Sequence, residues 1–177
     1  MSNTRFHREL NWVTSAIMAI LVVTISSVLG VGHASAADPP GSKTAARMVT
    51  TNGKMILGFA YPTAKKLDKI ELDDTDQSRD GSFTLTYTVD YTDKDGDAAY
   101  VTLKFTFDKS GKMLGVKETS RSSFWPAFGT AKLVLEATKE IIRNDEKARN
   151  SPDGKKLLAI DEPTEFLAEL LNLKAGK

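Results

Sequence analysis

The stretch that decides the fold is Phe83-Thr-Leu-Thr-Tyr-Thr-Val-Asp-Tyr91, together with Ala99-Tyr-Val-Thr-Leu-Lys-Phe-Thr-Phe107 after a short turn. Apolar and polar residues alternate through both segments, which predicts two strands that each bury one face. The pair Asp95-Gly96 between them is typical of a tight hairpin turn. These segments therefore predict an antiparallel hairpin with one apolar face and one face toward water.

Two further strands are predicted on either side of this hairpin. Residues 67–74 precede it, with Ile70 and Leu72 on one face, and a polar turn over residues 73–81 connects them to the hairpin. After the turn at residues 109–112, a strand is expected over residues 113–121. Together the four segments predict an antiparallel meander.

Helical periodicity appears before and after the predicted sheet. Residues 42–59 have apolar side chains at steps of three and four and predict one helix, which Tyr61-Pro62 ends. A second helix is predicted after Phe124-Trp-Pro126, with Pro126 in its first turn and Ser123 as its cap. Its apolar stripe runs from Ala131 to Ile142, and the segment 150–154 (Asn-Ser-Pro-Asp-Gly) breaks it. A last short helix starts at Asp161-Glu-Pro163 and has an apolar stripe of Phe166, Leu167, Leu170 and Leu171.

This order predicts the α+β class: an N-terminal helix, a four-stranded antiparallel meander and two C-terminal helices. The apolar face of the sheet has to be covered, and the flanking helices are the available cover. The outline is similar to the broad cystatin-like or NTF2-like shape, a curved antiparallel sheet wrapped on a helix. No family motif accompanies this likeness, so it is one of shape and implies no activity.

The first 36 residues have the pattern of a secretory signal peptide. Arg5 and Arg8 precede an apolar run from Val13 to Val31, and Ala34-Ser-Ala36 resembles a cleavage site. We expect a signal peptide over residues 1–36, a linker over 37–42 and a single domain over 43–177, secreted or periplasmic. The apolar run is about as long as a minimal membrane span of roughly 20 residues, so an uncleaved anchor in the inner membrane, with the domain outside, is the alternative.

Composition excludes several kinds of chemistry for the cleaved chain. The chain has no cysteine, and both histidines, His7 and His33, lie before the predicted cleavage site. Histidine is the commonest general base, so we lean against an enzyme and expect no cofactor and no metal. The acidic segment 93–97 fits a hairpin turn better than a calcium loop. The 24 basic and 23 acidic residues nearly balance, which offers nucleic acid no long-range attraction.

Two groups of residues are candidates for binding. Phe124, Trp125 and Phe128 form the most aromatic stretch, which either anchors a partner or plugs the end of the sheet. Glu118 is the second candidate, together with Tyr87 and Tyr91, which alternation places on the inner face of their strand. If Leu114 and Val116 point into the core, alternation points Glu118 the same way, and a ligand pocket at the mouth of the sheet becomes possible. The alternative is that Glu118 reaches water near the strand end.

We therefore expect an exported, non-catalytic binding, inhibitor or scaffold module whose partner is a protein or small ligand of the cell envelope. One alternative is a small cavity enzyme that uses carboxylates around Glu118 and Tyr87. The other is a membrane-tethered structural protein that keeps residues 13–31 as its anchor.

Overall fold

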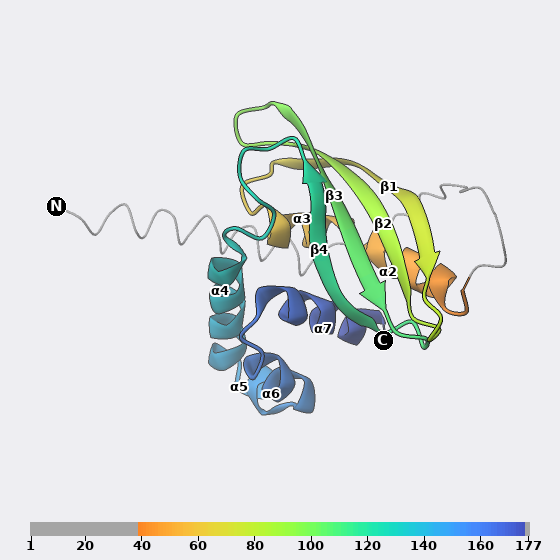
Figure 1. Cartoon of the computed structure of the whole chain (residues 1–177). Helices are drawn as coiled ribbons and strands as arrows, with labels where there is room; N and C mark the ends of the chain where they lie inside the picture. The colour runs from red at the N-terminus through yellow and green to blue at the C-terminus, as the bar shows by residue number, and fades with distance from the viewer. Residues whose placement is uncertain (1–38, 176–177) are drawn as a thin grey trace.

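The structure is a computed structural model that describes residues 39–175. The predicted signal peptide and its cleavage site lie outside the described residues. Four strands form one antiparallel sheet in the order β1-β2-β3-β4. They are β1 (Lys66–Gln77), β2 (Phe83–Thr92), β3 (Ala98–Phe107) and β4 (Met113–Arg121). Helices precede and follow the sheet, so the predicted α+β class with a four-stranded meander is confirmed (Figure 1).

All three hairpins of the meander turn in the same way. Each turn has a glycine at positive φ, and these are Gly81 (87°), Gly96 (97°) and Gly111 (85°). The amide of each glycine donates to the carbonyl three residues earlier, as in Gly96 to Asp93 at 3.2 Å. Side chains with a Cβ disfavour this left-handed conformation, so glycine at the third loop position sets the turn.

The two central strands have an uninterrupted register, from Phe83 opposite Phe107 to Thr92 opposite Ala98. Alternation along them gives one buried face and one half-exposed face, as the sequence predicts. The buried face consists of Phe83, Leu85, Tyr87, Val89, Tyr91, Val101, Leu103, Phe105 and Phe107, each 2 % exposed or less.

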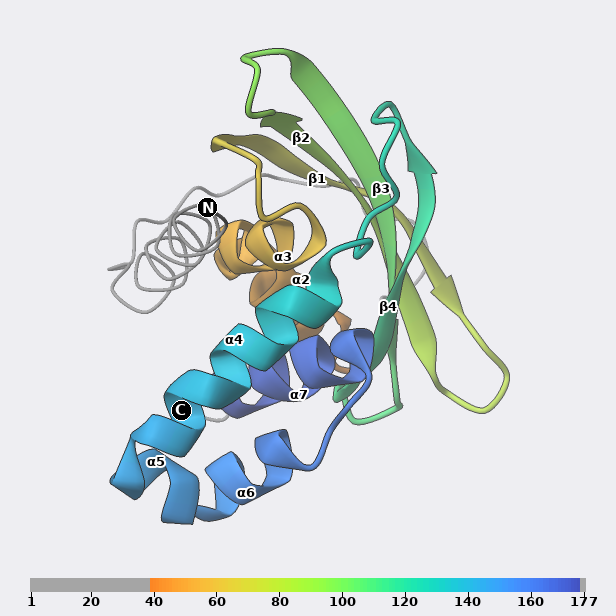
Figure 2. The same ribbon diagram turned by 90° about the vertical axis from the view of Figure 1, so that its left-hand side faces the viewer.

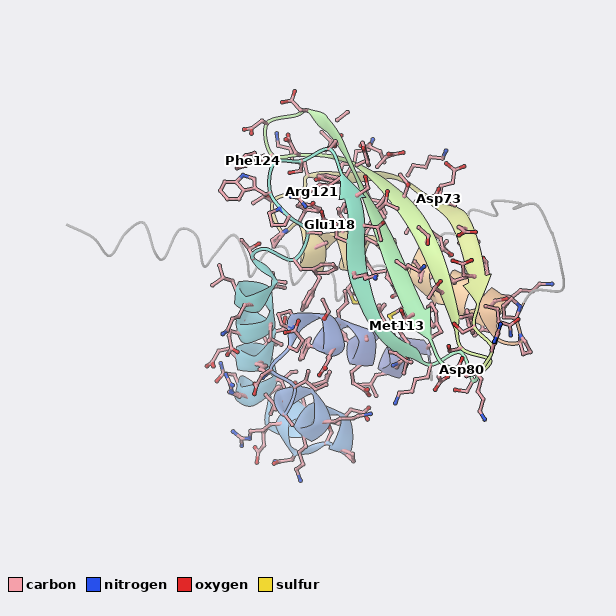
Figure 3. All side chains as sticks on the ribbon, in the orientation of Figure 1. Asp73, Asp80, Met113, Glu118, Arg121 and Phe124 are labelled. Carbon is pink, nitrogen blue, oxygen red and sulfur yellow. The ribbon has the colours of Figure 1, made fainter. Side chains whose placement is uncertain are left out.

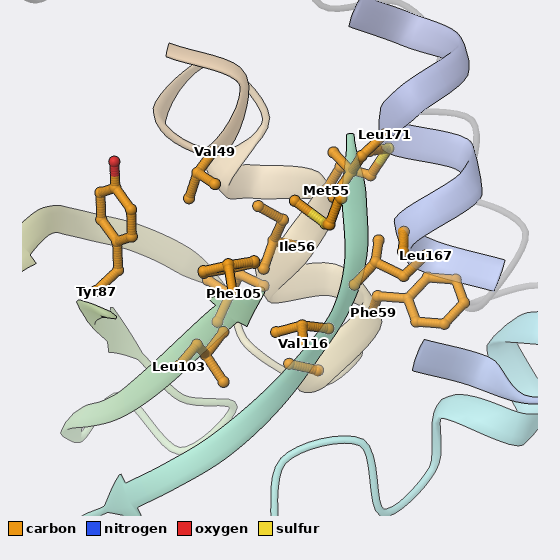
Figure 4. Close-up of a cluster of buried hydrophobic side chains, with 14 of the residues drawn as sticks. Val49, Met55, Ile56, Phe59, Tyr87, Leu103, Phe105, Val116, Leu167 and Leu171 are labelled. Atoms are coloured by element: carbon orange, nitrogen blue, oxygen red, sulfur yellow. The ribbon is translucent and has the colours of Figure 1, made fainter. Parts of the chain in front are cut away.

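Helices lie on the buried side of the curved sheet, as the view from the left-hand side shows (Figure 2). The elements are α2 (Ser42–Thr51) and α3 (Gly53–Ala60) before the sheet, and α4 (Ala131–Asn144), α5 (Glu146–Asn150), α6 (Pro152–Leu158) and α7 (Pro163–Ala175) after it. Ile56 and Phe59 of α3 and Leu167 and Leu171 of α7 meet the sheet side chains in a common core (Figure 4).

Four boundaries differ from the sequence-based predictions, and four helices rather than two follow the sheet within the described residues. The second predicted helix starts at Ala131 with Thr130 as its N-cap, and not at Pro126 with Ser123 as its cap. The N-terminal helix is two helices, because the chain bends at Asn52, whose side chain donates to the Met48 carbonyl at 2.8 Å. The first part of the predicted polar turn, residues 73–77, continues β1. The segment 150–154 does not simply break a helix: Ser151 accepts a hydrogen bond from the Gly154 amide and starts α6, with Pro152 in the first turn.

Candidate functional site

The segment after β4, residues 122–130, turns back alongside that strand and reaches α4 (Figures 1 and 2). Several hydrogen bonds fasten it to the body of the domain. The Phe128 amide donates to the Ala60 carbonyl at 3.0 Å, and the Tyr61 hydroxyl donates to the Trp125 carbonyl at 3.1 Å. Within the segment, the Trp125 amide donates to the Ser123 hydroxyl at 3.2 Å. We call residues 122–130 the aromatic loop.

A bulge in β4 determines which of its side chains face inward. Phe107 pairs with Met113 and Thr106 with Gly115, so Leu114 is the extra residue. Leu114 is consequently 52 % exposed, and the expectation that it points into the core is wrong. After the bulge the alternation resumes, and Val116 is buried as expected. Glu118 follows on the same face, and its side chain is 15 % exposed.

Both carboxylate oxygens of Glu118 have partners (Figure 3). One oxygen accepts the Ala127 amide at 2.5 Å, and the other forms an ion pair with the Arg121 guanidinium. Arg121 also donates through Nε to the Ser123 carbonyl at 3.0 Å. A carboxylate bound in this way holds the aromatic loop against the end of β4.

Two tyrosines lie near this carboxylate beneath the aromatic loop. The rings of Tyr61 and Tyr91 stack with their centroids 5.0 Å apart. Burial raises the pKa of Tyr61, and Tyr91 and the negative charge of Glu118 raise it further. Burial also raises the pKa of Tyr91. Both phenols therefore stay neutral at physiological pH and serve as hydrogen-bonding and packing groups.

Tyr87 lies elsewhere in the core. It is fully buried, and its hydroxyl donates to the Ala46 carbonyl of α2 at 3.3 Å. Leu103 is paired with Tyr87 on one side and with Glu118 on the other, so the two polar side chains are two strands apart, roughly 10 Å. The structure thus brings Glu118 together with Tyr61 and Tyr91 and separates it from Tyr87.

The aromatic stretch divides into two parts with different surroundings. Phe128 is half-buried, packs against the core and has a φ of 64°, which is unusual for a residue with a bulky side chain. Phe124 and Trp125 are 86 % and 71 % exposed. Their rings are nearly perpendicular, with centroids 5.5 Å apart. We call Phe124 and Trp125 the aromatic pair.

Sequence reasoning named Glu118, Tyr91 and the aromatic residues but missed Tyr61 and Arg121. The position of Tyr61 before a proline indicates only a helix end, yet Tyr61 stacks on Tyr91 and its hydroxyl holds the loop. Arg121 ends β4, and strict alternation would place it on the opposite face from Glu118. A second bulge, with Thr119 as the extra residue between the Leu103–Glu118 and Thr102–Ser120 pairs, changes this phase, and no sequence pattern predicted it.

Between residues 39 and 175, the structure has no group of three or more His, Cys, Asp or Glu side chains placed to hold a metal ion. In the same part of the chain, every helix is too short or too polar to span a bilayer. Comparison with protein-family models, with curated proteins and with solved structures gives no match to this chain. The function therefore has to be inferred from the site itself.

Proposed function

We propose that this protein is an exported binding module that captures a protein partner through the aromatic pair. The observation that carries the proposal is the exposure of Phe124 and Trp125 on a loop that is fastened along its length. The signal-peptide pattern of residues 1–36 supports the export part of the proposal.

Exposure of two adjacent large rings favours a partner that covers them. Complete burial of a large apolar side chain contributes about 1.5–3 kcal/mol. The aromatic pair can therefore supply a large share of the free energy of binding to a small interface. Tryptophan and arginine are also enriched among the residues that dominate protein–protein affinity, and Arg121 lies four residues before Trp125.

Fastening of the loop strengthens this proposal. A loop that must be ordered during binding loses conformational entropy, and this loss weakens the complex. Here the bonds of Glu118, Tyr61 and Phe128 already hold the backbone of the aromatic loop. The rings are thus presented on a preorganised support.

The hydrogen-bonding groups around the aromatic pair favour a protein, rather than a sugar, as the binding partner. Recognition of a sugar needs precisely placed polar groups beside the stacking ring. The carboxylate that binds the aromatic loop, Glu118, already has both oxygens bonded within the domain. A partner with apolar side chains fits the pair better.

An affinity experiment tests the proposal. The protein is immobilised and exposed to a native envelope extract, and captured proteins are quantified for wild type, for Phe124→Ala with Trp125→Ala, and for Leu133→Ala. Leu133 is the matched control because it is another large apolar side chain, 67 % exposed, on α4. We expect one captured protein to be lost with the aromatic-pair variant and retained with Leu133→Ala. Equal capture by all three proteins would contradict the proposal.

A further inference from the structure

β1 is the edge strand of the sheet and is 12 residues long. Among residues 39–175 it pairs only with β2, so its other side has backbone amides and carbonyls without a neighbouring strand. An exposed edge of this length is a template on which another chain can add a strand.

Two bulges interrupt β1, and the spacing of its inward residues accounts for them. Leu67, Ile70, Leu72 and Thr75 all lie opposite inward residues of β2. Their spacing is three, two and three, whereas a regular strand requires two. One extra residue must therefore fit between Leu67 and Ile70 and another between Leu72 and Thr75. The register shifts fall at these places, where Asp68 and Asp73 have no partner.

Each extra residue is an aspartate whose carboxylate is bound by a threonine of β2. The Thr92 hydroxyl donates to Asp68 at 2.8 Å, and the Thr88 hydroxyl donates to Asp73 at 2.7 Å. Both bulges are therefore held in the same way. They bend the edge strand and increase its twist, and this opposes pairing with a further strand.

The opposite edge, β4, has other parts of the chain beside it near its two ends. The Met113 amide donates to the Asn172 side-chain oxygen at 2.9 Å, and the Asn172 side-chain nitrogen donates to the Met113 carbonyl at 2.9 Å. The α7 side chain thus takes the hydrogen bonds that a neighbouring strand would make. Toward the other end of β4, the aromatic loop runs back beside the strand (Figure 2).

We propose that both edges of the sheet are closed against strand addition, β1 by its two aspartate-bound bulges and β4 by Asn172 and the aromatic loop. The closure keeps copies of the chain from joining edge to edge. It is independent of the aromatic pair, which acts through side chains.

Deletion of Asp68 and Asp73 together tests the β1 part. The deletion restores a period of two to the inward residues, so the strand becomes regular while its apolar register is kept. We expect the purified variant to shift from monomer to larger assemblies in size-exclusion chromatography with light scattering, with increased thioflavin T fluorescence. A folded variant that stays monomeric at the same concentration would overturn the proposal.

Asp68→Val with Asp73→Val is used if the deleted chain does not fold: it keeps both extra residues and removes the threonine hydrogen bonds that hold the bulges. A folded variant of this kind that stays monomeric would overturn the role of the two aspartates. The matched control is Asp90→Val with Glu136→Ala, which removes the same charge from the inner strand β2 and from α4. We expect the β1 substitutions to produce assemblies and the control to remain monomeric. Equal assembly of both proteins would show that lost charge, and not the open edge, is responsible.

For β4, Asn172→Leu removes both hydrogen bonds to Met113 with a side chain of similar size. We expect faster amide hydrogen exchange at Met113 and a shift toward assemblies. Unchanged exchange at Met113, with the variant monomeric, would overturn the role of Asn172.

Discussion

Substitution of Glu118 by alanine tests how the aromatic loop is held. The variant loses the acceptor of the Ala127 amide and the partner of Arg121. It leaves the tyrosine stack and the tyrosine bond to the Trp125 carbonyl in place. We therefore expect the loop to loosen locally and the domain to stay folded.

The magnitude follows from the two lost contacts. A hydrogen bond to a charged acceptor contributes about 1.5–3 kcal/mol when the group is largely buried. The ion pair adds about 0.2–1 kcal/mol, because the Arg121 side chain is 36 % exposed and water screens the interaction. We expect the free energy of unfolding of Glu118→Ala to fall by about 2–4 kcal/mol.

Urea unfolding followed by far-ultraviolet circular dichroism measures this change. The fluorescence of Trp125 reports the loop separately in a protein that starts at Ala37, because Trp12 is the only other tryptophan of the chain. Glu136→Ala, an exposed α4 carboxylate, is the control and should change stability by less than about 0.5 kcal/mol. A Glu118→Ala variant that is no less stable than this control would refute the reasoning.

Three further predictions concern other parts of the fold. Gly96→Ala should lower the free energy of unfolding by about 1–2 kcal/mol in urea unfolding, because the φ of Gly96 is 97°. Gly115→Ala is the control: its φ is not positive and no atom lies within 4 Å of the added carbon, so it should be neutral or slightly stabilising. Gly154→Ala should lower the melting temperature strongly in calorimetry, because the added Cβ would lie 1.9 Å from the Ala148 carbonyl oxygen of α5. A melting temperature equal to that of the wild type would contradict the close approach of α5 and α6. The hydrogen bond and charge of Lys139 hold the pKa of Asp161 below its ordinary 3.8, so the stabilisation is present above that value and is lost as the pH falls through the lower folded pKa. Asp161→Asn should therefore make the acid limb of a stability–pH curve slightly less steep, because the Asp161 side chain is 93 % exposed and other aspartates with lowered pKa values also contribute. An unchanged limb would exclude a contribution of the pair.

Strict alternation explains why the sheet was predictable from the sequence. In β2 and β3 each inward residue is separated from the next by one polar residue, so period and burial agree. In β1 only Ile70 and Leu72 keep the period of two, so the sequence predicted residues 67–74 and missed the continuation to Gln77 beyond the bulge at Asp73. The same kind of bulge in β4 reversed the expected direction of Leu114.

The candidate site was predictable only in part, because its contacts join distant positions. Exposure of the aromatic pair depends on how residues 122–130 fold over α3, and no local pattern encodes this. The bond between Tyr61 and the Trp125 carbonyl spans 64 positions of the chain. The helix boundaries at Asn52 and Ser151 depend on hydrogen bonds between these side chains and the backbone. The spacing of apolar residues does not reveal such bonds.

The dissociation constant of the captured partner, measured by titration calorimetry for wild type and for Trp125→Ala, tests the central claim most directly. If the exposed indole anchors the complex, Trp125→Ala should weaken binding by at least about 30-fold, equivalent to about 2 kcal/mol, with the Leu133→Ala control within about twofold of wild type. Binding by Trp125→Ala within about twofold of wild type would contradict the claim.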